Sequence, residues 1–332
     1  MAKTRGIVLY SGGLDSLLAA RILMEQGLDI IGFHCILPFV PPDSDPQDLP
    51  AARRASQIDL PLVFYRCGRE YLDMIKNPAH GYGKNFNPCI DCHIFFFRKA
   101  AEYMHETGAS FLATGEVVGQ RPMSQQKHML NHIIKETGLQ GKLLRPLSAK
   151  ILKPTLVEEQ GLVDRNRLFD ISGRGRRRQM ELAEQFGITE YESPAGGCLF
   201  TDPNVAPRIR DLVEHHEDYA PLDLFLTTVG RHVRIDERVK ILVSRSEKEN
   251  VILETHRDEA DYFFQPLFSG PDIFVKGLPN EKEFPFITSV IARYGKPRDD
   301  AREINIYQKG VFLKKILAGE RVSDEILNRM RI

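Results

Sequence analysis

A glycine-rich loop near the start of the chain joins a short apolar run to a helical segment, and this junction constrains the fold most. Residues 6–10, GIVLY, predict a buried strand, and Leu17–Gln26 predicts a helix that stops at Gly27. The loop between them is Ser11–Ser16, with the sequence SGGLDS. Strand, small-residue loop and helix in this order predict an α/β unit whose backbone amides and helix N-terminus bind a phosphate.

The composition of this loop indicates which phosphate chemistry it supports. The Walker lysine is missing, so transfer of a γ-phosphoryl group is not indicated. The carboxylate of Asp15 instead predicts Mg²⁺ on pyrophosphate oxygens. The loop would then stabilise pyrophosphate as the leaving group while the α-phosphorus is attacked. The alternative is a tight turn of small residues that binds nothing.

Apolar runs and helical stretches alternate through the first two thirds of the chain. Further strands are predicted at Ile30–Leu37, Leu62–Arg66 and Phe111–Thr114, and the longest predicted helix is Pro88–Glu106. Strands that alternate with helices predict an α/β fold, with a doubly wound parallel sheet and helices on both of its faces.

The pattern changes after Cys198. Pro203–Pro221 contains one charged helix, Arg208 to about Glu217, and is predicted to be a linker. The remainder predicts a smaller α+β domain with strands at Leu224–Val229, Lys240–Ser244, Tyr262–Leu267 and Asp272–Lys276 and helices at Lys248–Arg257 and Glu281–Tyr294. The expected domains are 1–203, a linker helix at 204–221, and 222–332.

Length and composition agree with two domains and exclude some classes of protein. The chain has 332 residues, too many for one typical domain. No apolar run is long enough to span a membrane, and Met1–Lys3 does not begin a signal peptide, so we expect a cytoplasmic protein without a membrane partner. Five cysteines, an odd number, argue against a disulfide framework.

Three of the cysteines are candidates for chemistry. Cys89 and Cys92 stand at a predicted helix start, with Asn87 as the cap and Pro88 as the first helical residue. Their spacing places both thiols on one face of the first turn, where the helix N-terminus lowers thiol pKa. Cys198 follows Gly196 and Gly197, which let the backbone approach another element.

Four interpretations of these thiols stay open. Three cysteines can hold a [4Fe–4S] cluster with one iron free for sulfur, which is the arrangement we expect. A structural zinc site would need His93 as a fourth ligand. Two of the thiols can instead form a relay that carries a persulfide. Finally, all three can simply be buried, as we expect for Cys35 and Cys67.

A basic segment precedes Cys198. Between Lys142 and Arg178 there are ten Lys and Arg against four Asp and Glu. The segment ends in the run Arg174, Arg176, Arg177 and Arg178. This density favours a surface that contacts the phosphate backbone of RNA over a merely solvated helix start.

Four ordered motifs resemble those of ThiI, the tRNA 4-thiouridine synthetase family of ATP-pyrophosphatases. They are Ser11–Ser16, Cys89–Cys92, the stretch 113–120 (ATGEVVGQ) with Ser124-Gln125, and residues 144–147 (LRPL). Asn87-Pro88-Cys89 and Cys198 also resemble MnmA, the tRNA 2-thiouridine synthetase family. The ThiI resemblance implies a sheet of the adenine nucleotide alpha hydrolase type. From the given sequence we expect neither the THUMP module nor the rhodanese domain of ThiI.

The C-terminal region resembles the RNA-binding domain of NFACT proteins. The matching residues are Val243-Ser244-Arg245, Glu249-Asn250, Asp261–Phe264 and Gly270-Pro271, with Ser244 where the family has glycine. This resemblance implies a second RNA-binding region.

Together these features predict ATP-dependent thiolation of tRNA, with 4-thiouridine as the expected product. The predicted ATP-binding residues are Ser11, Gly12, Gly13, Leu14, Asp15, Ser16, His34, Thr114, Gly115, Gln120 and Ser124. Thr114, Gly115, Gln120 and Ser124 rest on the ThiI resemblance, while His34 ends a predicted strand. Asp15, Cys89, Cys92 and Cys198 are the predicted catalytic residues.

The expected cofactors are ATP, Mg²⁺ and the [4Fe–4S] cluster, and the expected partners are tRNA and a sulfur donor, either inorganic sulfide or a cysteine desulfurase. A homodimer is compatible with the sequence. Two alternatives stay open: an ATP-pyrophosphatase that uses ammonia or another nucleophile, and a non-catalytic RNA-binding protein.

Overall fold

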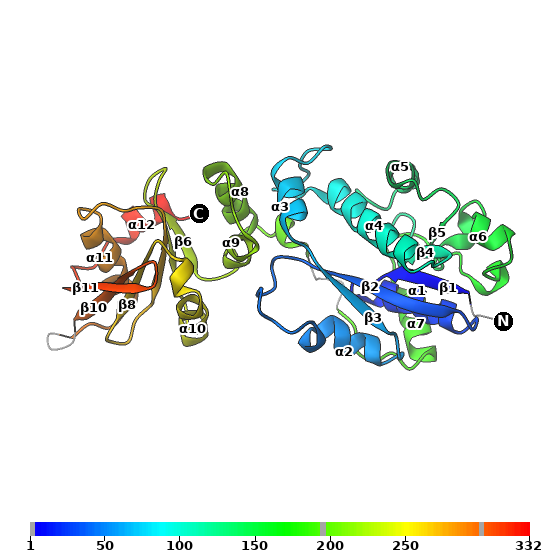
Figure 1. The fold of residues 1–332 in the computed structure, drawn as a ribbon, viewed down its shortest axis with the longest axis horizontal. Coiled ribbons are helices and arrows are strands. Elements are labelled where there is room, and N and C mark those ends of the chain that lie inside the picture. Colours follow the sequence, from blue (N-terminus) through cyan, green and yellow to red (C-terminus); the bar gives the residue numbers. More distant parts are fainter. Residues whose placement is uncertain (1–3, 193–196, 299–301) are drawn as a thin grey trace. The chain divides into compact units, whose positions relative to one another are not determined.

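The computed structural model describes residues 4–192, 197–298 and 302–332. They form two compact units, residues 1–201 and 202–332, each with its own sheet (Figure 1). We call them unit 1 and unit 2. The predicted linker, 204–221, falls within unit 2.

Unit 1 is built on a parallel sheet, which confirms the predicted doubly wound α/β fold. Its strands, in the order β3-β2-β1-β4-β5, are β1 (Arg5–Leu9), β2 (Asp29–Ile36), β3 (Leu62–Arg66), β4 (Phe111–Thr114) and β5 (Leu143–Leu144). Its helices are α1 (Leu14–Met24), α2 (Pro50–Ser56), α3 (Arg69–Lys76), α4 (Cys89–Glu106), α5 (Lys127–Thr137), α6 (Leu156–Glu159) and α7 (Arg177–Gln185).

The strand order fixes where a ligand can bind. The chain leaves β3 at one edge and returns at β4, on the other side of the central strand β1. In open parallel sheets ligands bind at such a reversal, outside the carboxyl ends of the strands. The segments that follow β1 and β4 therefore leave the same edge of the sheet side by side.

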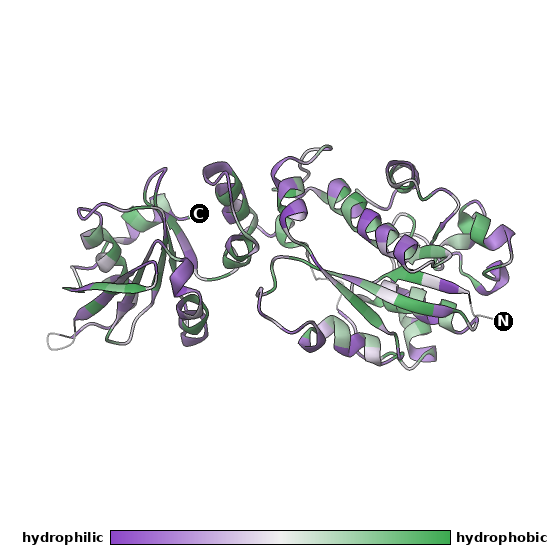
Figure 2. Ribbon diagram, viewed as in Figure 1, coloured by the Kyte–Doolittle hydropathy of each residue, from purple (hydrophilic) through white to green (hydrophobic). Residues whose placement is uncertain are grey.

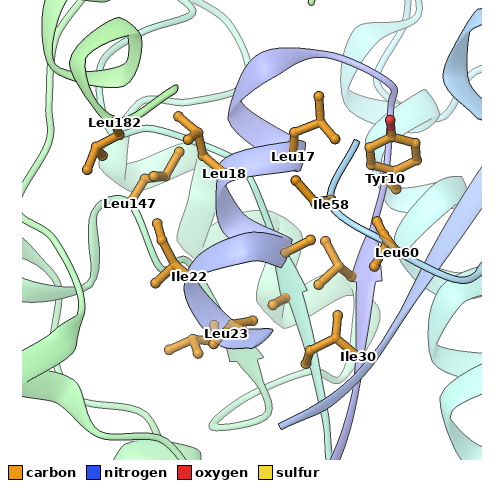
Figure 3. Packing of buried hydrophobic residues seen from close by; sticks show 14 of the residues in the cluster. Tyr10, Leu17, Leu18, Ile22, Leu23, Ile30, Ile58, Leu60, Leu147 and Leu182 are labelled. Atoms are coloured by element: carbon orange, nitrogen blue, oxygen red, sulfur yellow. The ribbon is translucent and has the colours of Figure 1, made fainter. Parts of the chain in front are cut away.

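Helix α1 lies in the middle of one apolar layer. Its sequence is apolar on nearly all sides, which is typical of a helix buried all round. Leu18 and Ile22 lie near Leu147 and Leu182, while Leu17 lies on the side of Ile58 and Tyr10 (Figure 3). The helix that carries the glycine-rich loop is thus held firmly in the core.

Helices α4 and α5 cover the opposite face of the sheet. Alternation along β1 sends Ile7 to this face and Val8 to the face of α1. Phe97 and Met104 of α4 are buried against this layer. Figure 2 shows hydrophobic and hydrophilic bands alternating along α4, as expected of a helix with one apolar side.

Unit 2 contains an antiparallel sheet with helices on both faces. Its strands, in the order β11-β10-β8-β9-β7-β6, are β6 (Arg231–Arg234), β7 (Lys240–Val243), β8 (Tyr262–Pro266), β9 (Ile273–Lys276), β10 (Glu303–Gln308) and β11 (Val311–Leu317). Its helices are α8 (Ala206–His215), α9 (Pro221–Leu226), α10 (Glu247–Thr255), α11 (Phe284–Tyr294) and α12 (Asp324–Met330). This is the smaller domain beside the α/β sheet that the sequence predicts.

Helix α8, within the predicted linker, is tied to the second sheet by a buried acid. Asp211 of α8 accepts hydrogen bonds from Arg234 Nη2 at 2.8 Å and pairs with Lys240 Nζ at 2.7 Å. Burial alone would favour protonation, but both cations hold the pKa of Asp211 below its usual range.

One predicted strand is wrong. Leu224–Val229, predicted as a strand, overlaps helix α9 and the turn after it. Leu224, Phe225 and Leu226 are buried. Short apolar runs do not distinguish a buried helical turn from a strand, and Pro221 at the first helical position was the overlooked signal.

Candidate active site

The glycine-rich loop follows β1 and is fixed by its own serines. Ser16 Oγ donates to the Gly13 carbonyl at 2.8 Å, and the Ser11 amide donates to Ser16 Oγ at 3.3 Å. Gly12 has a φ of +83° and lies so close to α2 that a Cβ would stand 3.1 Å from the Ala51 Cβ. Glycine is therefore required at this position by both conformation and space.

Asp15, in the first turn of α1, has one satisfied and one unsatisfied carboxylate oxygen. Oδ2 accepts a hydrogen bond from Gln120 Nε2 at 2.8 Å, while Oδ1 is buried without a hydrogen-bond partner among the described residues. Burial raises the pKa of Asp15, although Gln120 and the charge of Arg176 act in the opposite direction. A lone buried carboxylate oxygen beside a phosphate loop fits Mg²⁺, which prefers such oxygen ligands.

The segment after β4 packs directly on the first turn of α1. A Cβ on Gly115 would stand 2.4 Å from the backbone carbon of Asp15 and 2.5 Å from the Ser16 amide nitrogen. Any side chain there would push the two segments apart. Thr114 precedes this contact, and its hydroxyl accepts a hydrogen bond from the Glu116 amide at 3.0 Å.

Glu116 connects this contact to a thiol through a chain of polar groups. Arg145 Nε donates to Glu116 Oε2 at 2.9 Å, and His93 Nδ1 lies 3.3 Å from Glu116 Oε1. His93 also interacts with the Cys89 thiol, because it lowers the pKa of Cys89 and Cys89 raises the pKa of His93. Cys, His and Glu thus stand in the order thiol, base and orienting acid, an arrangement that activates a nucleophile.

The electrostatics of this chain of polar groups ease ionisation of the Cys89 thiol. Burial opposes ionisation of Cys89, but His93, Ser124 and Arg121 together lower its pKa. Burial likewise opposes charging of His93, yet its bonds to Cys89 and Glu116 raise the pKa of His93 to about 9. Burial opposes ionisation of Glu116 as well, but Arg145 and His93 together lower the pKa of this carboxyl.

Helix α4 begins one residue later than predicted. Cys89 is its first residue and Pro88 is the cap, and no cap side chain bonds the helix; the Pro88 carbonyl accepts from the Cys92 amide at 2.9 Å. The prediction of Asn87 as the cap and Pro88 as the first helical residue was therefore wrong. Pro88 accepts the first helical bond without needing its missing amide.

Cys92 and Cys198 have surroundings that differ from those of Cys89. Cys92 is buried, and its Sγ lies 3.3 Å from the Tyr71 hydroxyl; burial raises its pKa. Cys198 is exposed, with Sγ 4.0 Å from Asn87 Oδ1, and desolvation of its thiol raises its pKa. Of the two glycines predicted to form a hinge before Cys198, Gly196 lies outside the described residues and Gly197 is exposed.

The thiols do not form a metal site in this geometry. Within 4–192, 197–298 and 302–332, no three His, Cys, Asp or Glu side chains are grouped so that they could hold a metal ion. Cys89, Cys92 and Cys198 therefore do not fit the [4Fe–4S] cluster as placed, and the cluster stays a prediction. The same holds for zinc held with His93.

The arginine run divides between two surroundings. Arg174, Arg177 and Arg178 are exposed, and the last two share Glu181 as their ion-pair partner. Arg176 is less exposed, its Nε is buried without a hydrogen bond, and its charge lowers the pKa of Asp15. The charge of Arg176 thus acts on the phosphate loop, whereas Arg174, Arg177 and Arg178 remain exposed.

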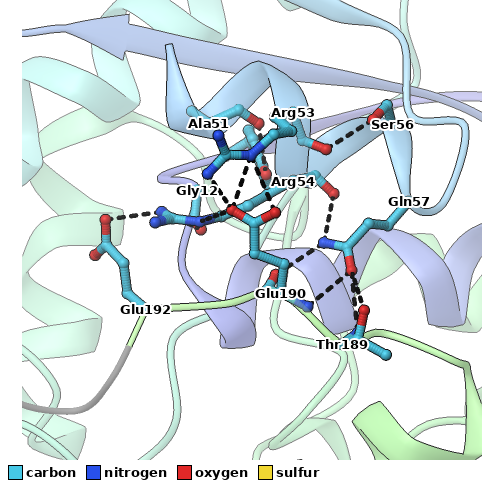
Figure 4. A network of polar contacts seen from close by, with 10 residues as sticks. Gly12, Ala51, Arg53, Arg54, Ser56, Gln57, Thr189, Glu190 and Glu192 are labelled. Carbon is cyan, nitrogen blue, oxygen red and sulfur yellow. Dashed lines mark hydrogen bonds and ion pairs between the residues drawn. The ribbon is translucent and has the colours of Figure 1, made fainter.

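A polar network anchors the chain just before Cys198 (Figure 4). Arg54 of α2 donates to the Gly12 carbonyl at 3.3 Å and to Glu192 at 2.8 Å. Arg53 pairs with Glu190, and the Gln57 side chain accepts from the Glu190 amide at 2.9 Å. Helix α2 thereby joins the phosphate loop to the segment that leads toward Cys198.

The remaining predicted residues lie close to the ends of β1 and β4. His34 Nδ1 donates to the Tyr10 carbonyl at 2.9 Å, one residue before the loop, and burial lowers its pKa. Ser124 and Gln125 are buried beyond β4.

The sequence did not reveal the roles of Glu116, Arg121 and Arg145 in the site, and it suggested His93 only as a zinc ligand. The available signal for His93 was its position four residues after Cys89 on a predicted helix.

Replacement of His93 by Gln tests the activation of Cys89. We expect the pKa of Cys89 to rise, because the group that stabilises its thiolate most is lost. The rate of iodoacetamide alkylation at Cys89, followed against pH by peptide mass spectrometry, should shift to higher pH. Alkylation of Cys198 is the internal reference. An unchanged profile at Cys89 would contradict the thiolate–imidazolium pair.

The chain matches two family models, one in each unit. Residues 4–158 match the tRNA methyl transferase HUP domain, and residues 230–329 match the NFACT protein RNA binding domain. The chain therefore joins a HUP-type α/β segment to a segment similar to an RNA-binding domain.

Curated relatives share part of unit 1. The tRNA-specific 2-thiouridylase MnmA of Trichlorobacter lovleyi is 35% identical over 122 residues, covering 35% of this chain and 34% of its own. The corresponding protein of Desulfosudis oleivorans is 30% identical over 112 residues, covering 32% and 30%. The chain thus spans about a third of the length of these relatives.

A solved structure of a 4-thiouridine synthetase–RNA complex with bound ATP aligns with 20% identity and a TM-score of 0.34. The alignment covers 56% of this chain and 52% of that chain.

In the part of the chain that the structure describes, no helix is both long and apolar enough to cross a membrane.

Proposed function

We propose that the protein uses ATP to adenylate a uridine carbonyl oxygen in tRNA and then replaces that oxygen with sulfur. The observation that carries the proposal is that two consecutive residues, Gly115 and Glu116, connect the phosphate loop to the Cys89 thiol. Gly115 packs on the Asp15 end of the phosphate loop, and Glu116 orients the His93–Cys89 pair. A nucleotide site next to an activated thiol suits a reaction that first adenylates the uridine oxygen and then replaces that oxygen with sulfur.

The first half of the reaction belongs to the phosphate loop. The uridine carbonyl oxygen attacks the α-phosphorus, the bond to the β-phosphate oxygen breaks, and pyrophosphate leaves. Loop amides and the α1 N-terminus bind the leaving group, with Arg176 adding positive charge. Asp15 would hold Mg²⁺, which neutralises pyrophosphate charge when it is bound.

The second half belongs to the cysteines. The exposed Cys198 receives sulfane sulfur from a persulfide donor, such as a cysteine desulfurase, and its terminal sulfur attacks the adenylated carbon so that AMP leaves. The Cys89 thiolate then attacks Cys198 Sγ. The S–S bond breaks, the thiolated base departs, and a Cys89–Cys198 disulfide remains, which an external dithiol reduces.

Two observations favour this relay over the predicted cluster. Cys89 has a lowered pKa and an orienting base, as an attacking thiol needs, while Cys92 is buried against Tyr71. Cys198 is exposed, so a persulfide donor can reach its thiol, whereas the thiol of Cys92 is buried. Iron and sulfide analysis of anaerobically purified protein tests the choice, because stoichiometric iron would support the cluster.

The two resemblances point to different uridine positions. The motifs of unit 1 predicted 4-thiouridine, whereas the curated relatives are named 2-thiouridylases. We place the reaction at carbon 2, because these relatives align with this chain at 30–35% identity.

Nucleoside mass spectrometry tests the proposed function. The full chain is incubated with tRNA, ATP, Mg²⁺, a persulfide donor and a dithiol, and the digested tRNA is analysed for both isomers. ATP-dependent 2-thiouridine is the expected product. 4-Thiouridine would correct the position, and AMP formation without any thiolated nucleoside would overturn the proposed sulfur transfer.

The exposed arginines should contribute to RNA binding through phosphate contacts. Changing Arg174, Arg177 and Arg178 together to Ala should flatten the plot of log K against log salt by about 2. The matched control, Arg176→Ala, should leave this slope intact and weaken ATP binding instead, because the charge of Arg176 acts on Asp15 in the phosphate loop. Filter binding at several salt concentrations measures both, and an unchanged slope in the triple variant would move the RNA surface elsewhere.

A further inference from the structure

Unit 2 contains a pocket of about 710 Å³ that the proposed chemistry does not use. It opens where β7 ends, α10 begins and the β8–β9 connection passes, and its walls include Arg231, Phe268 and Tyr294. Its volume lies within the range of small-molecule and cofactor sites, roughly 300–1,000 Å³.

A buried carboxylate without a partner lines this pocket. Asp272 is only 4% exposed, and its carboxylate oxygens make no hydrogen bond or ion pair with any residue that the structure describes. Burial, with the negative charges of Glu254 and Glu247, raises the pKa of Asp272 to about 7. An unpaired carboxylate at such a depth costs folding free energy, which a ligand with hydrogen-bond donors would recover.

The rest of the pocket wall is held in place by its own bonds. Asn250 Oδ1 accepts from the Asp272 amide at 3.0 Å and from the Ser244 hydroxyl, and Asn250 Nδ2 donates to the Gly270 carbonyl at 3.3 Å. Gln265 donates to Glu254 at 3.0 Å. The polar groups around Asp272 are thus engaged with one another, while Asp272 itself stays free.

Charged and aromatic groups surround this carboxylate. The pocket is lined by three cations, Arg231, Arg245 and Lys296, and by three acids, Asp272, Glu247 and Glu254, so the formal charges of its lining balance. The Arg231 guanidinium stacks on the Tyr294 ring, 4.5 Å from its centroid, and Phe268 adds another aromatic surface. The pocket therefore offers planar surfaces, an acceptor in its depth and cations at its wall.

We propose that this pocket binds one unpaired guanine nucleotide of RNA, with the Asp272 carboxylate accepting the two donors of the guanine Watson–Crick edge. Guanine presents its N1–H and 2-amino group side by side, which matches the two oxygens of a carboxylate. Each of the other three bases presents at least one acceptor beside its donor on that edge. Single-stranded RNA bases are commonly bound by this edge while they stack on aromatic rings or guanidinium planes.

The proposal deepens the proposed function, because it rests on RNA binding by residues 202–332. The probes are labelled uridine oligoribonucleotides, roughly ten residues long, with guanine, inosine or adenine at the centre. Inosine lacks only the 2-amino group. Fluorescence anisotropy of the full chain with each oligomer should give at least about tenfold tighter binding to guanine than to inosine.

Two matched variants locate this preference. Asp272→Asn should abolish the difference between guanine and inosine, because an amide places a donor opposite one guanine donor. Glu247→Gln, an exposed carboxylate of the same pocket, should keep the difference. Equal binding of all three oligomers to the unmodified chain would overturn the guanine pocket but leave RNA binding standing. Failure of every oligomer to bind would instead remove RNA binding itself.

A competition arm distinguishes RNA from free nucleotide. GMP should displace the guanine oligomer only at much higher concentration than unlabelled oligomer does, because phosphate contacts outside the pocket are lost. Displacement by GMP at equal concentration would assign the pocket to a free guanine nucleotide and contradict the proposal that the bound guanine belongs to RNA.

Thermal stability supplies a readout independent of RNA. The folded pKa of Asp272 lies above the value of an unfolded Asp, so stability is lost as pH rises from about 4 through 7. Asp272→Asn should therefore raise Tm at pH 8 and change it little at pH 4. A variant with lowered Tm at pH 8 would show that the carboxylate is structural and would overturn its role as a ligand group.

Discussion

Asp15→Asn is expected to reduce formation of AMP and pyrophosphate by roughly a thousandfold without unfolding the protein. The amide can still occupy the same space and bond Gln120, so the first turn of α1 should stay in place. What is lost is the negative charge at Oδ1, the buried oxygen without a partner. Release of pyrophosphate in the presence of tRNA, ATP and Mg²⁺ measures the effect.

Asp29→Asn serves as the matched control for this change. Asp29 pairs with Arg5 on the surface of the same sheet, at 2.6 Å, and is remote from the loop in sequence. An exposed pair of this kind contributes little to stability. The control should keep normal turnover, and near-normal turnover of Asp15→Asn would refute the metal-binding role of Asp15.

Cys89→Ser should abolish sulfur transfer, by roughly a thousandfold or more, while leaving formation of AMP measurable. The serine hydroxyl is not ionised beside His93, so it cannot attack the Cys198 sulfur. The phosphate loop does not include Cys89, and the first half of the reaction should therefore continue. Thiolated nucleosides and pyrophosphate are quantified from the same reaction.

The other cysteines separate the relay from the cluster. The relay predicts that Cys198→Ser resembles Cys89→Ser, whereas Cys92→Ser keeps most of the activity because Cys92 bonds Tyr71 outside the relay. Cys35→Ser controls for general effects of losing a thiol. Equal loss in the Cys89, Cys92 and Cys198 variants, with loss of bound iron, would restore the [4Fe–4S] cluster.

Local patterns predicted the sheet of unit 1 well. The predicted strands at Leu62–Arg66 and Phe111–Thr114 coincide with β3 and β4, because both are apolar runs between clear helical segments. β5 escaped prediction because it has only two residues. β6 escaped as well, since its sequence RHVR alternates charge with burial over only four residues.

The site was harder to predict because its partners are distant in sequence. The loop and Cys89 stand out locally, but Glu116 acquires its role only when β4 brings it beside His93 and Arg145. The surroundings of Arg176 were also not predictable from the local sequence. Its neighbours Arg177 and Arg178 are exposed, whereas Arg176, the residue before α7, is half-buried and its charge lowers the pKa of Asp15. The density of arginines in the sequence located the positive charge but did not show which groups each arginine acts on.

Transfer of a labelled oxygen tests the central claim most directly. A tRNA whose target uridine carries ¹⁸O at carbon 2 is incubated with the full chain, ATP, Mg²⁺, the persulfide donor and a dithiol. If the carbonyl oxygen attacks the α-phosphorus, each thiolated uridine must leave its ¹⁸O in AMP. Mass spectrometry should therefore find one ¹⁸O per AMP, in equal amount to the thiouridine formed. AMP that contains only oxygen from ATP and water, alongside thiolated tRNA, would contradict adenylation of the uridine.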